Sequence, residues 1–222
     1  MKLNRVFERP AEMPEVIPVF PLSGALLLPR RPLQLNIFEP RYLAMLDDAL
    51  SGDRLIGMIQ PSAEDMPAGS KAELCQVGCA GRLVQFAEIG DGRCIISLMG
   101  VARFKVRGEA GSGEPYRMAR VKFDDFAADF REGEGESLVD RESLLQALRK
   151  FAEANKFRID WDDIEQASNE ALVNGLSMIS PYGAREKQAL LEAADLKARA
   201  EMLVAITQME LARSSSLSTR IH

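Results

Sequence analysis

The sequence predicts an α+β protein in which a β-rich subdomain precedes a bundle of helices. Up to about residue 127 the apolar residues mostly alternate with polar ones, as in half-buried strands, whereas after residue 136 they recur at three- and four-residue steps, as in amphipathic helices. A stretch rich in Gly and Glu separates the two patterns. We therefore expect an N-terminal extension, a β-rich subdomain, a helical subdomain and a flexible tail, with the bounds 1–14, 15–127, 136–212 and 213–222.

The strands of the β-rich part are expected where Val, Ile and Phe gather and Gly or Pro interrupts them. These segments are Val16–Leu22, Leu55–Gln60, Val77–Ile89, Arg93–Met99, Val101–Arg107 and Tyr116–Phe123. The glycines between Ile89 and Arg93 tolerate the positive φ of a tight turn, so a hairpin is expected there, and a second reversal at Gly108–Pro115. Short strands joined by hairpins predict a closed or strongly curved antiparallel sheet.

One helix is expected inside the β-rich part. Pro40 suits a first helical position, and Gly52 suits the end of a helix. Leu43, Leu46 and Leu50 fall on one face between them, so this helix is predicted to cover the sheet.

The helical part begins with a capping signal. Ser137 followed by Asp140 resembles a capping arrangement, and Asp160 is predicted to cap the next helix, which Pro181 and Gly183 then break. We expect helices over 137–155, 160–180, 184–193 and 195–212.

Composition and residue types argue against catalysis. Cys75, Cys79 and Cys94 are odd in number, which argues against a disulfide framework and favours a reducing, cytoplasmic location. The single histidine is residue 222, so neither a histidine-based active site nor a zinc site is expected. A phosphate-binding GxxxxGK[ST] loop and an apolar run long enough to span a membrane do not occur in the sequence. We therefore expect no enzyme, no metal and no cofactor.

A basic stretch leaves one alternative open. Arg103, Lys105 and Arg107 recur with the period of a strand and would line one of its faces. They are interpreted as the solvent side of a half-buried strand or, alternatively, as an RNA-binding strip. The net charge of -5 arises after residue 126, which argues against nucleic acid as a partner.

The segment from Ile17 to Tyr42 carries the most distinctive pattern. It contains Ile17-Pro18-Val19-Phe20-Pro21-Leu22, then Leu28-Pro29, then Leu35-Asn36-Ile37-Phe38-Glu39-Pro40-Arg41-Tyr42. This pattern resembles the N-terminal, substrate-binding domain family of Lon protease, and weaker matches continue in order to Leu211. Asn36 stands where family members often carry histidine, which favours a structural role for that position.

The resemblance implies a PUA-like pseudobarrel followed by a helical subdomain, standing alone without the ATPase and peptidase modules. It also implies a non-catalytic module that binds unfolded or degron-bearing polypeptides, as an adaptor or chaperone-like protein in protein quality control. Lon itself or another protease is a further candidate partner. An RNA-binding protein with a PUA-like fold is the alternative, and no membrane partner is expected.

The motif residues Phe38, Glu39, Pro40, Arg41 and Tyr42 are interpreted as structural. Phe38 is expected to bury in the core, Pro40 to start the helix, and Glu39 to form charge-assisted hydrogen bonds with Arg41 at the corner between strand and helix. Direct ligand contact by these residues is the minority alternative.

Peptide binding is expected at an apolar and partly exposed surface, because unfolded segments offer mainly apolar side chains and backbone groups. Two loops are candidates: Leu26, Leu27 and Leu28 with Arg30 and Arg31, and the loop that contains Met66. Either loop could equally be part of the core.

Overall fold

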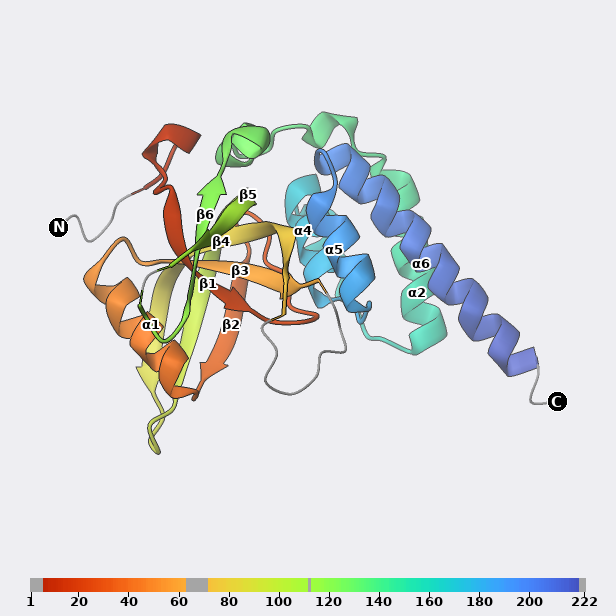
Figure 1. Ribbon diagram of the computed structural model, residues 1–222. Coiled ribbons are helices and arrows are strands. Elements are labelled where there is room, and N and C mark those ends of the chain that lie inside the picture. Colours follow the sequence, from red (N-terminus) through yellow and green to blue (C-terminus); the bar gives the residue numbers. More distant parts are fainter. Residues whose placement is uncertain (1–5, 63–71, 112, 220–222) are drawn as a thin grey trace. The chain divides into compact units, whose positions relative to one another are not determined.

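The structure is a computed structural model that describes residues 6–62, 72–111 and 113–219 (Figure 1). It contains two compact units, Met1–Glu132 with Pro181–Leu191, and Gly133–Ser180 with Glu192–His222. The first unit is built on a sheet and the second is helical, so the α+β class predicted from the sequence is confirmed. The segment Pro181–Leu191 belongs to the sheet unit, although its sequence period groups it with the helices.

The first unit is dominated by strands. Its elements are η1 (Pro10–Glu12), β1 (Val16–Pro21), β2 (Pro32–Ile37), α1 (Pro40–Ser51), β3 (Leu55–Pro61), β4 (Leu74–Glu88), β5 (Cys94–Ala110), β6 (Arg117–Lys122), η2 (Asp124–Phe130) and α5 (Ala184–Glu192). The hairpin expected between Ile89 and Arg93 joins β4 to β5, and Ile89 N–H donates to the Arg93 carbonyl. The segments expected as two strands after Arg93 form the single long strand β5.

Five strands close into a barrel. They pair in the order β5, β4, β3, β1 and β6, and β6 returns to pair with β5. β2 lies outside this ring and pairs with the first part of β5. β1 and β3 are parallel, so the expectation of a wholly antiparallel sheet is wrong at this pair. The reason is that β2 and α1 lie between β1 and β3 in the chain and form the long crossover that a parallel pair requires.

The barrel interior holds the core of the first unit. Ile17, Val19, Ala102, Phe104 and Ala119 are almost completely buried there. Tyr42 from α1 stacks on Phe20 of β1, with ring centroids 4.1 Å apart, which fixes α1 against the barrel.

Polar contacts hold α5 on the sheet. Gln60 of β3 is buried, and its amide nitrogen donates to the Ala184 carbonyl at 3.0 Å and to the Gln188 side chain at 3.1 Å. Lys187 donates to the Gly24 carbonyl at 3.0 Å. These contacts join residues far apart in the sequence, which explains why local periodicity did not assign α5 to the sheet unit.

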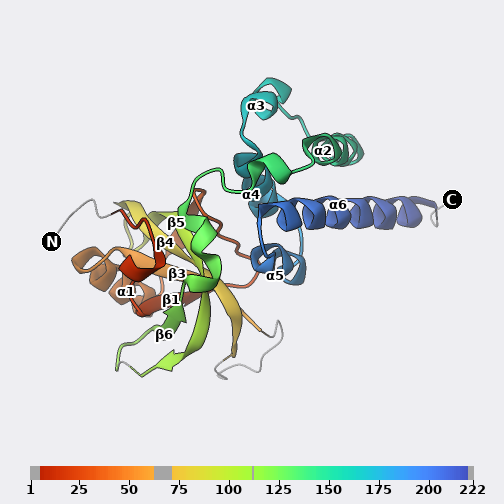
Figure 2. The same ribbon diagram turned by 90° about the horizontal axis from the view of Figure 1, so that it is seen from above.

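The second unit consists of η3 (Glu136–Leu138), α2 (Arg141–Asn155), α3 (Trp161–Gln166), α4 (Asn169–Ile179) and α6 (Leu196–Thr219). α2 and α4 pack against the long helix α6 (Figure 2). Asp140 rather than Ser137 caps α2, because the Asp140 carboxylate accepts from the Ser143 N–H. α6 ends at Thr219, whereas the sequence predicted an end at Ala212 and a flexible tail.

The expected single helix after Asp160 is two helices. Asp160 caps α3 as expected, but Ala167 is extended and Ser168 caps a new helix, α4. The side chain of Arg141 donates to the carbonyls of Ile164, Glu165 and Ala167. Arg141 therefore satisfies the end of α3 and fixes the break.

Candidate functional site

The motif that joins β2 to α1 is a corner in which several side chains contact one another. Pro40 begins α1, and the Arg41 guanidinium donates to the Glu39 carboxylate at 2.9 Å, as expected. Arg41 also lies over the ring of Tyr42 at 4.7 Å. Burial raises the pKa of the Tyr42 phenol, and the charge of Arg41 opposes this rise.

Phe38 is the exception, because its side chain is 60% exposed. The expectation that it would bury in the core is therefore wrong. Leu35 and Ile37 are buried, so the core-facing side of β2 is occupied by these two residues. Phe38 follows Ile37 directly, so its side chain falls on the opposite, outer side of the strand with Asn36.

The opposite holds for the loop that contains Leu26, Leu27 and Leu28, which we call the leucine loop, because it was expected to be partly exposed. Leu26, Leu27 and Leu28 are all buried, so they do not form the partly exposed rim that we expected. Glycines make the space for them: a Cβ at Gly81 would lie 2.7 Å from the Leu27 Cδ2 atom, and a Cβ at Gly100 would collide with the Leu28 carbonyl. This loop is part of the core.

The other residues expected to bind peptide are Arg30, Arg31 and Met66. Arg30 donates from its guanidinium to the Asp129 carbonyl at 2.6 Å, so it anchors η2 to the loop. Arg31 is half-buried, and its carbonyl accepts from Gly100 N–H at the start of the β2–β5 pairing. Met66 lies outside the described residues.

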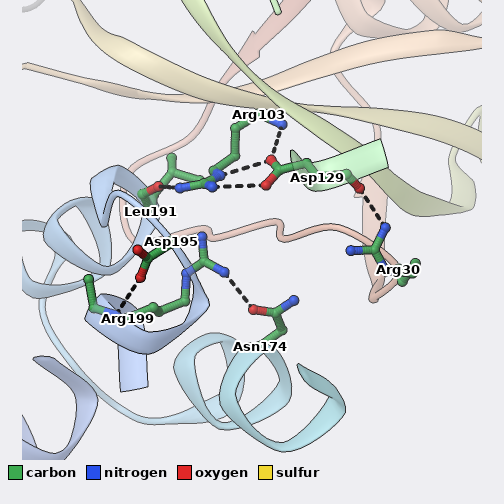
Figure 3. Close-up of polar contacts among 8 residues, drawn as sticks. Arg30, Arg103, Asp129, Asn174, Leu191, Asp195 and Arg199 are labelled. Carbon is green, nitrogen blue, oxygen red and sulfur yellow. Dashed lines mark hydrogen bonds and ion pairs between the residues drawn. The ribbon is translucent and has the colours of Figure 1, made fainter. Parts of the chain in front are cut away.

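The expected basic strip does not form, because the Arg103 side chain pairs with the Asp129 carboxylate (Figure 3). Its side chain is 2% exposed, and it forms a two-pronged ion pair with Asp129 at 2.8 Å on each prong. Arg103 also donates to the Leu191 carbonyl at 3.1 Å and lies over the Phe126 ring at 4.3 Å. Lys105 pairs with Asp125 at 2.9 Å. The observation on which the RNA-binding alternative rested is therefore lost.

An exposed apolar surface lies where β2 ends beside the β4–β5 hairpin. The pairing register places Asn36, Ile95 and Ala87 in one row across the outer side of these strands. Ile89 follows the last residue of β4 and its N–H donates to the Arg93 carbonyl, and Phe38 follows the last residue of β2, Ile37. Ile89 is 43% exposed and Ile95 is half-buried. We call Phe38, Ala87, Ile89 and Ile95 the hairpin-end surface.

Charged side chains surround the hairpin-end surface. Arg93 and Asp91 of the turn form an exposed ion pair at 3.6 Å, and the Glu39–Arg41 pair follows Phe38. An apolar patch with a polar rim is typical of an interaction surface. In Figure 1 the β4–β5 hairpin extends past the end of β2 at the bottom of the view.

Sequence reasoning missed most of this surface. It named Phe38 but gave it a core role, and it did not consider Ala87, Ile89 or Ile95. A signal was present in the sequence, because the apolar residues continue into the tip of the hairpin, where a sheet offers few neighbours to cover them.

The helical unit has a separate hollow of about 390 Å³ at the end of α2. Arg149, Lys156, Phe157 and Trp161 line it, and the Arg149 guanidinium lies 5.0 Å from the centre of the Trp161 ring. Within the described ranges, no helix is long and apolar enough to cross a bilayer, and no group of three metal-binding side chains comes together.

Several Lon proteases are similar to this chain in sequence. The Lon protease of Flavobacterium johnsoniae is 26% identical over 204 residues, which cover 90% of this chain and 25% of that protease. Lon protease 2 of Myxococcus xanthus is 29% identical over 201 residues, which cover 87% of this chain and 23% of that protein. The chain thus spans about a quarter of the length of these curated relatives.

Solved structures share the fold. A Lon N-terminal domain protein from Xanthomonas campestris aligns with a TM-score of 0.61 at 21% identity, over 86% of this chain and 97% of that one. The N-terminal domain of the Mycobacterium avium complex Lon protease aligns with a TM-score of 0.63 at 18% identity, over 87% and 98%. The family model for the substrate-binding domain of ATP-dependent protease La (Lon) matches residues 16–208. The chain belongs to the Lon substrate-binding domain family.

Proposed function

We propose that this chain binds unfolded or degron-bearing polypeptides without cleaving them, as an adaptor or chaperone-like module in protein quality control. Membership of a substrate-binding domain family is the observation that carries this proposal. The matched relatives are proteases, and the chain corresponds to about a quarter of their length. Lon or another protease is the candidate downstream partner in the cytoplasm.

The hairpin-end surface supports the proposal physically. Unfolded chains differ from folded ones chiefly in offering apolar side chains and unpaired backbone groups, so a general receptor for them needs exposed apolar contacts. Phe38 provides a large aromatic side chain that is 60% exposed, and Ile89 just after the end of β4 is 43% exposed. Aromatic residues of this kind commonly dominate binding energies at protein interfaces.

The proposal also fits the chemistry that surrounds this surface. The Glu39–Arg41 and Arg93–Asp91 pairs are exposed and of balanced charge, so they favour neither acidic nor basic clients strongly. Affinity should then follow the apolar content of the client rather than its net charge. This is the behaviour expected of a module that discriminates unfolded from folded protein.

The test measures binding of the full chain to a reduced and carboxymethylated globular protein, which remains unfolded in native buffer. Phe38→Ser should weaken binding about tenfold or more, because an aromatic anchor contributes roughly 2 kcal/mol. The native form of the same globular protein should not bind.

Ile179→Ser is the matched control, because Ile179 is 78% exposed but lies in α4 of the helical unit. It should leave the affinity unchanged. Failure of the unaltered chain to bind any of several unfolded proteins would overturn the proposed function. Equal effects of the two substitutions would overturn the assignment to the hairpin-end surface.

A further inference from the structure

We propose that β2 is a receptor edge to which an extended segment of a client polypeptide adds as a further strand. This inference rests on the proposed function and specifies how the client is held. Among the six strands of the described chain, β2 is the one that pairs with a single neighbour, β5, along its whole length. The other five have partners on both sides, although the last residues of β4, from Gln85 to Glu88, pair only with β5.

The register shows which backbone groups are on the open side of β2. Gly100 N–H donates to the Arg31 carbonyl at 3.0 Å, so the pairs that exchange hydrogen bonds with β5 fall at Arg31 and every second residue after it. Leu33, Leu35 and Ile37 therefore bond to β5. The N–H and C=O groups of Gln34 and Asn36 point away from β5.

These outward groups match an extended chain. Two residues along a strand span about 6.8 Å, so Gln34 and Asn36 present donor and acceptor pairs at the spacing of an antiparallel or parallel ladder. Gln34 and Asn36 are both exposed residues. Only an extended polypeptide backbone offers complementary groups at the same repeat, which identifies the occupant by its chemistry.

The edge also lacks the usual protection against pairing. Natural sheets block free edges with charged residues, prolines or bulges. From Leu33 to Phe38 no residue is charged and none is proline, and the β2–β5 register is continuous. Pro32 removes one N–H, at the first position of the strand.

Backbone recognition and the hairpin-end surface act together. Phe38 follows β2 directly, so a client strand along the edge would bring its own side chains past this exposed ring. The backbone contacts do not depend on the client sequence, whereas contact with Phe38 favours apolar residues. Together they select unfolded segments of many sequences.

The decisive variant is Asn36→Pro. It removes an outward N–H and adds a ring on the open side, but Asn36 makes no ladder bond to β5, so the strand keeps its pairing. Binding of the carboxymethylated protein by the full chain should fall about tenfold.

Gln34→Lys should also weaken binding, since a charged side chain on an edge strand opposes pairing with a further strand. Ser97→Lys is its matched control, because Ser97 lies directly opposite Gln34 and is half-buried, but β5 pairs there with β2 on one side and with β4 on the other.

Hydrogen exchange provides the second readout. Saturation with a short peptide of alternating Val and Thr should protect the amides of Gln34 and Asn36, and the same peptide N-methylated at its central residues should not bind. Unaltered affinity of both Asn36→Pro and Gln34→Lys for the carboxymethylated protein would overturn the edge proposal and leave the proposed function standing. Absence of any binding by the unaltered chain would overturn the function itself. Self-association of the chain that Asn36→Pro abolishes, with no peptide protection, would identify a second copy as the occupant and overturn the proposal.

Discussion

Breaking the ion pair between Arg103 and Asp129 should destabilise the first unit severely. The side chains are 2% and 8% exposed, and the Asp129 carboxylate accepts from both prongs of the guanidinium and from the Arg103 backbone N–H at 2.9 Å. Asp129→Ala would leave a buried guanidinium without its counter-charge. Removing one partner of a buried pair costs about 3–5 kcal/mol, a large share of the roughly 5–15 kcal/mol that stabilises a typical domain.

The paired substitution separates charge from packing. In Arg103→Met with Asp129→Asn, neither position carries a buried charge, and the Asn side chain can still accept from the backbone N–H of residue 103. We therefore expect the double variant to be clearly more stable than Asp129→Ala alone, because loss of a matched pair costs less than an orphaned charge.

Urea unfolding followed by circular dichroism measures these free energies. Trp161 is the single tryptophan and lies in α3, so its fluorescence reports on the helical unit separately. A loss below about 1 kcal/mol for Asp129→Ala would mean that Arg103 reaches water, and the buried position of Arg103 would be refuted.

Three further predictions concern other parts of the chain. Gly100→Ala should prevent stable folding of the first unit, seen as a lost cooperative transition, because its Cβ would collide with the Leu28 backbone. Burial, and after it the hydrogen bond to Asp48, raise the pKa of the Tyr116 phenol. The contribution of this phenol to the free energy of unfolding is therefore complete below pH about 10 and falls as the pH rises further. Asp48→Asn should lower the pH at which the ultraviolet absorbance of Tyr116 changes. Arg141→Ala should cost about 2 kcal/mol in the helical unit, read from tryptophan fluorescence, because the carbonyls at the end of α3 lose their donor.

Features set by neighbouring residues were predictable from the sequence. Pro40 and Gly52 bound α1 as expected, and Glu39 meets Arg41 because the two residues lie on one short corner. The turn before Arg93 was also predictable, since its glycines have positive φ. In each case the signal and the structure lie within a few residues of one another.

Exposure was not predictable from these local signals. Three leucines beside two arginines look like a partly exposed loop, but Gly81 and Gly100, distant in the sequence, leave the space that buries them. Phe38 looks like a core residue, but β2 buries its other side and ends beside a hairpin that continues beyond it. The exposure of the leucine loop and that of Phe38 are therefore the reverse of what the sequence predicted.

The burial of the charged side chain of Arg103 was likewise not predictable from the residues around it in the sequence. Its alternation with Lys105 and Arg107 predicts a solvent-facing strip, and nothing in that stretch reveals that Asp129 of η2 supplies a buried counter-charge. The β2 strand was missed for a related reason. Its exposed positions are Pro32, Gln34 and Asn36, and Pro and Asn are uncommon in strands. Its pairing partner also lies far along the chain, in β5.

The most direct test of polypeptide binding at the end of β2 is site-specific photo-crosslinking. A photoreactive phenylalanine analogue is placed at Phe38 or, as the control, at Ile179, and each full chain is irradiated with the carboxymethylated unfolded protein. We predict crosslinks from position 38 that an excess of unlabelled unfolded protein suppresses, and none above background from position 179. Equal crosslinking from the two positions, or none from position 38 while binding is measured in solution, would contradict this account.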